Sequence, residues 1–159
     1  MGRKKPNIPP YLYEREFCGN FAMIPPDLYE AQAFQELSHA ARNFYVLLAV
    51  NATSQAQKQC LYQTLKAYND ILQLGMSEED VKYATWGNKR QHTFSTLFVI
   101  PAKQLEIYGY TPQYANKLKH ELINHGFIKV AYSGKGRATG WSQNVTIYQF
   151  SGAWKLKRS

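Results

Sequence analysis

The segment from residue 101 to residue 151 constrains the fold most strongly, because helix signals and strand signals follow one another there in a set order. A short helical pattern leads to a Tyr-Gly-Tyr turn, and a second helical pattern covers residues 111–125. Thr111 is a residue type that caps helix N-termini, Pro112 fits the first helical turn, and Gly126 fits the C′ position that ends a helix. The sequence therefore predicts two helices joined by a short turn.

Two strand patterns enclose a glycine-rich loop directly after the second helix. The apolar and aromatic residues from Phe127 to Tyr132 predict one strand, and those from Val145 to Phe150 predict another. The glycines of the loop 133–143 lack the spacing of a phosphate-binding loop, and the chain continues into a strand instead of a helix. A hairpin behind two such helices is typical of a wing, so we expect an α+β fold.

The helix 111–125 has two faces of different chemistry. At about 100° per residue, Ala115, Leu118 and Leu122 fall on one side and predict a packed face. The opposite side carries Gln113, Asn116, Lys117 and His120. Amides of this kind pair with adenine, and a cation suits guanine or phosphate, so this side is suited to a DNA major groove. An ordinary solvated helix face would have the same composition; the hairpin behind the helix favours DNA.

These segments resemble the winged helix-turn-helix family of DNA-binding proteins. The similarity lies in Tyr108-Gly109-Tyr110-Thr111-Pro112-Gln113-Tyr114, Leu118-Lys119-His120-Glu121-Leu122, Gly126-Phe127-Ile128 and Val145-Thr146-Ile147-Tyr148. Upstream, Phe21-Ala22-Met23-Ile24-Pro25, Leu28-Tyr29 and Leu37-Ser38-His39-Ala40-Ala41-Arg42-Asn43-Phe44-Tyr45 are similar to the opening of the winged-helix domain of bacterial plasmid replication initiators and related mobile-element proteins. The resemblance implies a protein that binds a specific double-stranded DNA site in plasmid or mobile-element replication initiation, conjugative transfer or transcription regulation.

The resemblance also implies which residues contact DNA. The groove-reading residues would be Gln113, Asn116, Lys117 and His120, the residues near the DNA backbone Thr111 and Tyr114, and the cations of the wing tip Lys135 and Arg137. Lys89 and Arg90 form a further basic pair, which either reaches phosphate or belongs to a solvated turn.

The rest of the chain predicts an N-terminal arm and a helical insertion. Residues 1–19 read as a basic arm, and residues 20–159 as one winged-helix domain with a two- or three-stranded antiparallel wing sheet. Within this domain we expect one short helix from Leu28 to Phe34 and a longer helix capped by Ser38.

An additional segment, residues 53–92, separates the longer helix from a strand expected at residues 93–100. Apolar periodicity predicts a helix from Gln55 to Leu74, and the acidic residues after Ser77 predict a further helix start. A minimal winged helix has no such insertion. This supports a second hypothesis, a protein-interaction or homodimerisation module of a nucleoprotein complex that binds DNA only unspecifically.

The positive charge is concentrated in the part that resembles a DNA reader. The net charge of the chain is +8, and residues 101–159 hold nine bases and two acids, which gives +7. Residues 21–80 hold three bases and seven acids, which gives −4. This distribution suits a phosphate-binding surface. RNA binding is left open by the many aromatic residues, whereas a membrane-surface helix is disfavoured because the apolar face around Leu118 is needed for packing.

The sequence contains no motif of a known catalytic centre. The histidines lack the spacing of a metal site, no serine lies in a nucleophile elbow, and paired carboxylates are absent from the basic half. We therefore expect a protein that is not an enzyme and that has no cofactor and no metal. Cys18 and Cys60 have no pairing pattern, and the N-terminus has no apolar signal region, so a reducing, cytoplasmic location is expected.

Overall fold

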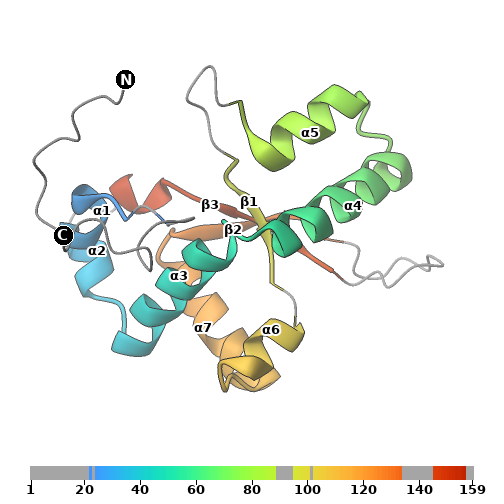
Figure 1. The fold of residues 1–159 in the computed structure, drawn as a ribbon. Helices are drawn as coiled ribbons and strands as arrows, with labels where there is room; N and C mark the ends of the chain where they lie inside the picture. Colours follow the sequence, from blue (N-terminus) through green and yellow to red (C-terminus); the bar gives the residue numbers. More distant parts are fainter. Residues whose placement is uncertain (1–21, 23, 89–94, 101, 134–144, 157–159) are drawn as a thin grey trace, which may run out of the picture.

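The computed structural model describes residues 22, 24–88, 95–100, 102–133 and 145–156. Within these ranges, five helices precede the first strand: α1 (Pro26–Glu30), α2 (Gln32–Gln35), α3 (His39–Asn51), α4 (Gln55–Leu72) and α5 (Glu78–Trp86). The chain continues through β1 (Leu97–Val99), α6 (Ala102–Ile107), α7 (Pro112–Asn124), β2 (Ile128–Tyr132), β3 (Ile147–Phe150) and the 3-10 helix η4 (Ala153–Leu156). Figure 1 shows these elements along the chain.

The strands form one three-stranded antiparallel sheet in the order β1-β3-β2. Phe98 of β1 lies opposite Tyr148 of β3, and Val130 of β2 lies opposite the same residue on the other side. The register shifts between Val130 and Tyr132, where β2 has an irregularity. The expected mixed α+β class with a small antiparallel sheet is thus confirmed.

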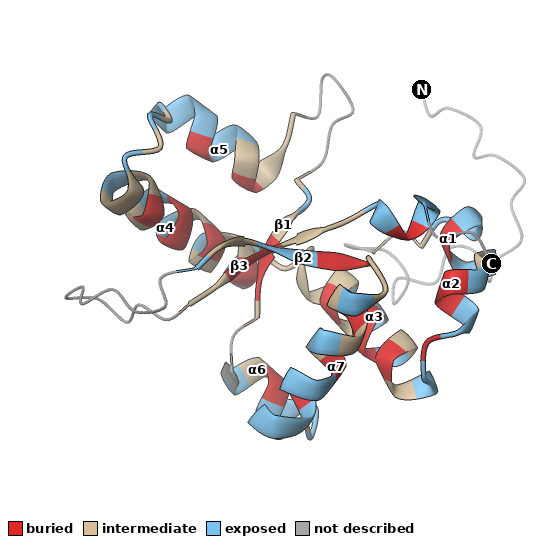
Figure 2. Ribbon diagram, turned by 180° about the vertical axis from the view of Figure 1, so that it is seen from behind, coloured by how far each residue is buried: buried red, intermediate tan, exposed pale blue. Residues whose placement is uncertain are grey.

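The two faces of the sheet contact two different groups of helices. Successive strand residues point to opposite faces; accordingly Phe98 and Tyr148 belong to a core that includes residues of α3 and α7, whereas Val99 and Ile147 belong to a core that includes residues of α4 and α5. Figures 1 and 2 show the sheet between these two helical layers. The sheet is therefore the shared centre of the fold.

The N-terminal helical segment differs from the single helix expected between Leu28 and Phe34. The structure has two short helices there, because Ala31 is extended with φ −60° and ψ 138° and ends α1 where α2 begins. This break lets both Leu28 and Phe34 enter the core, where their exposed fractions are 6% and 1%. A continuous helix was the wrong prediction, because burial of both side chains outweighs local helix periodicity here.

The helix starts predicted at serine residues are confirmed. The hydroxyl oxygen of Ser38 accepts a hydrogen bond from the Ala41 N–H and begins α3. Ser77 and Asp80 form a reciprocal capping box at the start of α5. The helix expected to reach Leu74 ends earlier, at Leu72, because Gln73 adopts a left-handed conformation with φ 53°.

The insertion 53–92 contributes α4 and α5 to the folded core. Leu61 and Leu65 of α4 are fully buried, in the same cluster as Val99 and Ile147 of the sheet. The Gln57 amide also donates to the Val99 carbonyl, at 2.8 Å between Nε2 and O. The apolar face of α4 is therefore used inside the molecule, against its own sheet.

The expected strand at residues 93–100 is shorter in the structure. Of this stretch, β1 contains Leu97–Val99, while Thr93 and Phe94 lie outside the described residues. The two predicted strands of the hairpin are confirmed at Ile128–Tyr132 and Ile147–Phe150.

Candidate nucleic-acid interface

The helix α7 begins and ends at the residues that the sequence indicates. The Thr111 hydroxyl oxygen accepts a hydrogen bond from the Tyr114 N–H at 3.1 Å, and Pro112 occupies the first turn. At the other end Gly126 has φ +82°, a left-handed conformation that favours glycine. A Cβ atom at Gly126 would lie 2.8 Å from the Trp154 backbone nitrogen, so the space there also requires glycine.

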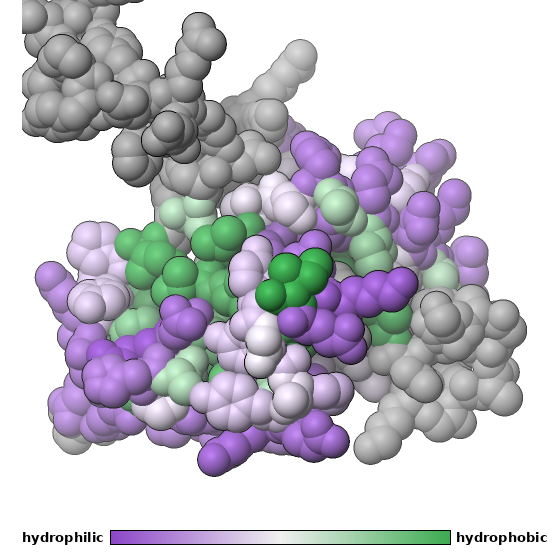
Figure 3. All heavy atoms as spheres, turned by 60° about the horizontal axis from the view of Figure 1, so that its bottom comes forward, coloured by the Kyte–Doolittle hydropathy of each residue, from purple (hydrophilic) through white to green (hydrophobic). Residues whose placement is uncertain are grey.

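The two faces of α7 differ in burial as expected. Ala115, Leu118 and Leu122 are buried, with exposed fractions of 2%, 2% and 0%. The opposite face is exposed and comprises Gln113, Asn116, Lys117 and His120. Figure 3 views the molecule with the end formed by α6 and α7 brought forward, where hydrophilic residues predominate around a small apolar area. The exposed polar face of α7, defined by these four residues, is called the α7 polar face below.

Helix α3 fixes the position of α7 through a buried contact and a polar contact. Phe44 and Leu48 of α3 lie in the same core as Leu118 and Leu122 of α7. At the edge of this core, the Glu121 carboxylate accepts hydrogen bonds from the backbone N–H and the hydroxyl group of Ser38, at 2.7 and 2.9 Å. These contacts fix the orientation of α7, and with it the polar side of the helix, relative to α3.

The turn between α6 and α7 is closed by a glycine and an aromatic stack. Gly109 has φ +83°, and the Tyr110 N–H donates to the Leu105 carbonyl at 2.9 Å. The Tyr110 ring stacks on the ring of Tyr114 in α7, with centroids 5.9 Å apart and planes 16° apart. The Asn43 amide of α3 donates to the Tyr110 hydroxyl oxygen at 3.3 Å. Tyr114, which is 43% exposed, is thus supported from below at the first turn of α7.

One lysine of the basic half has an internal role. Lys119 is half-buried; its ammonium donates to the Tyr148 hydroxyl oxygen at 3.2 Å and lies 5.5 Å from the centroid of that ring. This lysine therefore joins α7 to β3. Lys117, two residues earlier, is exposed and remains available to a partner.

The predicted site residues fall into two groups. Thr111, Gln113, Tyr114, Asn116, Lys117 and His120 lie together on the first three turns of α7 and its cap, and all six are exposed. The oxygen of Thr111 is engaged as the helix cap, so this hydroxyl has its proton left to donate. Lys89 and Arg90, and Lys135 and Arg137 of the wing, lie outside the described residues.

Sequence reasoning missed exposed residues of α6 and the turn that follows it. Lys103 is exposed in the first turn of α6, Ile107 is 77% exposed at its end, and Tyr108 is 53% exposed in the turn. Since Leu105 of α6 is buried, a helical phase set on it would have indicated that Lys103 and Ile107 face away from the core.

The described residues contain neither a cluster of metal-ligand side chains nor a helix suited to span a membrane. In the part of the chain that the structure describes, no three His, Cys, Asp or Glu side chains are grouped so that they could hold a metal ion. The His125 ring nitrogen Nδ1 is 2.9 Å from the Glu121 carbonyl oxygen, which gives that ring a local structural partner. None of the described helices combines the length and the apolar character needed to cross a membrane.

Comparisons with protein-family models, with curated proteins and with solved structures found no match for this chain.

Proposed function

We propose that this chain is a winged helix-turn-helix protein that binds a specific double-stranded DNA site through α7 and the wing 133–143. The observation that supports this most strongly is the α7 polar face: four exposed polar side chains opposite three buried apolar ones. Amide, ammonium and imidazole groups on one exposed helix face are the chemistry with which proteins read base edges in the major groove.

The order of the elements supports the winged-helix assignment. Helices α6 and α7 follow β1 and precede the β2–β3 hairpin, and the strand order β1-β3-β2 places the hairpin next to β1 through β3. In a winged helix the first helix packs against the two helices of the helix-turn-helix, and the hairpin that follows forms the wing. In this chain α3 takes the supporting position, because it shares its core with α7.

The rigidity of α7 supports a reading function over a merely solvated helix. Its N-terminus is capped by Thr111, its last turn is tied to the start of α3 through Glu121, and Tyr114 is stacked on Tyr110. Groups held in place before binding lose less conformational freedom when they bind. The DNA-contacting face is thus organised in the free protein.

We assign the protein to the replication initiation, conjugative transfer or transcription regulation of a plasmid or other mobile element, following the resemblance of its sequence. Its partner is then double-stranded DNA, with a second copy or another member of a nucleoprotein complex as a further partner. The apolar face of α4 is buried against Val99 and Ile147. Assembly through the insertion would accordingly use its exposed surface.

The test is selection of binding sites from a library of random short duplexes, followed by footprinting on the selected site at about 0.15 M salt, where screening is near physiological. Wild type is compared with the double variant Asn116→Ala, Lys117→Ala. The matched control is the double variant Gln63→Ala, Lys66→Ala, which removes an exposed amide side chain and an exposed ammonium group from α4.

The proposal expects one protected motif that is lost in the α7 variant and kept in the α4 control. The symmetry of that motif then distinguishes a monomer from a dimer, because a two-fold protein reads a palindromic site. If wild type protects no motif and its DNA binding is unspecific and salt-sensitive, the α7 assignment is wrong. The interaction-module hypothesis then takes its place.

A further inference from the structure

A pocket of about 520 Å³ lies between α5 and the sheet, on the opposite sheet face from α7. Its volume falls in the range of small-molecule sites. The lining residues that matter for its chemistry are Tyr83 of α5, Leu97 of β1, Gln149 of β3, and Lys129 and Tyr132 of β2. These residues come from four separate elements, so only the folded chain brings them together.

The pocket exists because the insertion covers this sheet face only in part. Val99 and Ile147 are buried beneath α4 and α5, with exposed fractions of 2% and 0%. The next cross-strand row runs through Leu97, Gln149 and Lys129, which are register partners across the three strands. This row is left as the floor of the pocket, with Tyr83 and Ala84 of α5 forming the facing wall.

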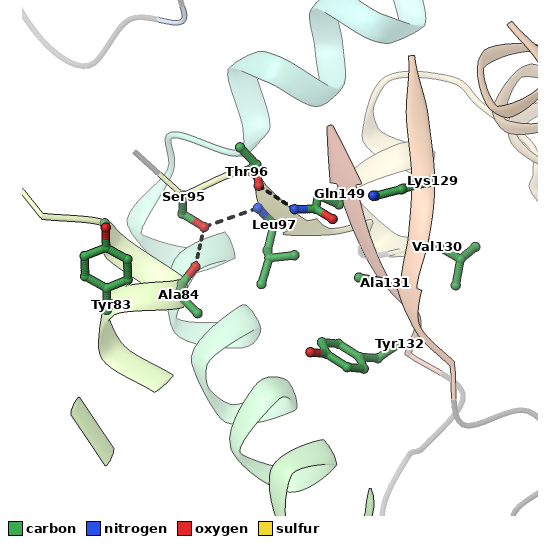
Figure 4. A pocket seen from close by; sticks show the side chains of 11 residues that line it. Tyr83, Ala84, Ser95, Thr96, Leu97, Lys129, Val130, Ala131, Tyr132 and Gln149 are labelled. Carbon is green, nitrogen blue, oxygen red and sulfur yellow. Dashed lines mark hydrogen bonds between the residues drawn. The ribbon is translucent and has the colours of Figure 1, made fainter. Parts of the chain in front are cut away.

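The polar groups of the row are available to a ligand. Lys129 is exposed, and its ammonium has no ion-pair or hydrogen-bond partner within the described ranges. The Gln149 amide uses one N–H on the Thr96 hydroxyl oxygen at 2.9 Å, which leaves its oxygen and its second N–H. Figure 4 shows Lys129 and Gln149 side by side on the same side of the sheet, whereas Val130 points away.

The remaining walls are aromatic and apolar. Tyr83 is 47% exposed at the rim, and Tyr132 stacks on Tyr68 of α4 with ring centroids 6.1 Å apart. Leu97 and Ala131 add apolar surface between them. Among the described lining residues, aromatic side chains stand beside a floor that carries the Lys129 ammonium and the Gln149 amide, which suits a flat ring with a negative group.

We propose that this pocket binds a small aromatic anion, of which nucleoside 5′-monophosphates are the test case. The ring of the ligand lies against Tyr83, the amide of Gln149 contacts the edge of the ring, and the ammonium of Lys129 pairs with the phosphate. The site is separate from the α7 polar face, so this proposal does not depend on DNA binding.

The test is calorimetric titration of the full chain with AMP, GMP, CMP and UMP, with inorganic phosphate and adenosine as partial ligands. We expect saturable binding of at least one nucleotide, and weaker binding of both partial ligands. Lys129→Gln should weaken that binding about tenfold, because it removes a charge-assisted hydrogen bond. Tyr83→Leu should weaken it by a similar factor through lost stacking.

Two controls separate this site from the α7 polar face. Lys117→Gln removes an exposed ammonium from α7 and should leave nucleotide affinity unchanged. Circular dichroism of Lys129→Gln and Tyr83→Leu checks that both variants keep the wild-type fold; both side chains are exposed.

Three results would overturn the proposal. No saturable binding of any of the four nucleotides would remove it, and so would inorganic phosphate binding as tightly as the nucleotides. A loss of affinity in Lys117→Gln in place of Lys129→Gln would move the nucleotide to the α7 polar face. None of these results bears on the DNA footprint, which the α7 double variant tests separately.

Discussion

The Glu121 carboxylate of α7 accepts two hydrogen bonds from Ser38, one from its backbone N–H at 2.7 Å and one from its hydroxyl group at 2.9 Å. Ser38 also caps α3 by accepting from the Ala41 N–H. A single carboxylate therefore links the start of α3 to the last turn of α7. Because Glu121 lies on the same helix as the α7 polar face, this link joins the stability of the fold to the position of the proposed contact surface.

Glu121→Gln should lower the free energy of unfolding by about 1–2 kcal/mol, because it replaces charge-assisted hydrogen bonds with neutral ones. Urea unfolding followed by circular dichroism measures this. Glu106→Gln is the control: this glutamate is exposed on α6, and its substitution should change stability by less than about 0.5 kcal/mol. Equal stability of the two variants would show that the Ser38 contact contributes nothing.

Lys117→Gln should weaken DNA binding and reduce its salt dependence. Loss of one phosphate contact lowers the slope of log K against log salt by about 0.9 for duplex DNA. The slope is measured by fluorescence anisotropy between low and physiological salt. Lys66→Gln, at an exposed lysine of α4, should leave the slope unchanged. A reduced slope in Lys66→Gln and an unchanged slope in Lys117→Gln would place the phosphate contacts on the insertion.

Leu65→Ala in the insertion should destabilise the whole protein by about 2–5 kcal/mol, the usual cost of a large-to-small change in a core. Leu65 is 0% exposed and belongs to the core that includes Val99 and Ile147 of the sheet. We expect one unfolding transition at lower denaturant concentration, monitored by tryptophan fluorescence and circular dichroism together. Two separate transitions, with the sheet unaffected, would mean that the insertion folds as an independent unit. Lys66→Ala serves as the neighbouring surface control.

Tyr45→Phe should remove part of the alkaline loss of stability. Burial raises the pKa of Tyr45 from 10.0 to about 12, so between these pH values the unfolded chain loses this proton and the folded chain keeps it. Stability is thus complete below pH 10 and falls as the pH rises toward about 12, by about 2–3 kcal/mol at 1.36 kcal/mol per pKa unit. Unfolding measured at pH 8 and at pH 11 should show a smaller difference in Tyr45→Phe than in wild type. An identical difference in both proteins would contradict this assignment.

Local patterns predicted α7 well because its determinants are close together in the chain. The cap at Thr111, the proline at the first turn and the left-handed Gly126 all act at the ends of one helix. Helical periodicity also places Leu118 and Asn116 on opposite faces of that helix. Such preferences need no knowledge of the partner helices. The single helix expected at residues 28–34 failed for the opposite reason, since long-range packing of Leu28 and Phe34 decided the break at Ala31.

The sequence by itself determined the helix starts, the class of the fold and the two faces of α7, because capping, turn preference and periodicity are local properties of the chain. Only the tertiary structure decided that Glu121 accepts hydrogen bonds from Ser38, that Lys119 donates to Tyr148, and that Lys129 and Gln149 line a pocket with Tyr83. Each of these contacts joins residues far apart in sequence. Their formation depends on how the helices pack against the two faces of one sheet. Local patterns along the chain do not specify which distant residues this packing brings together.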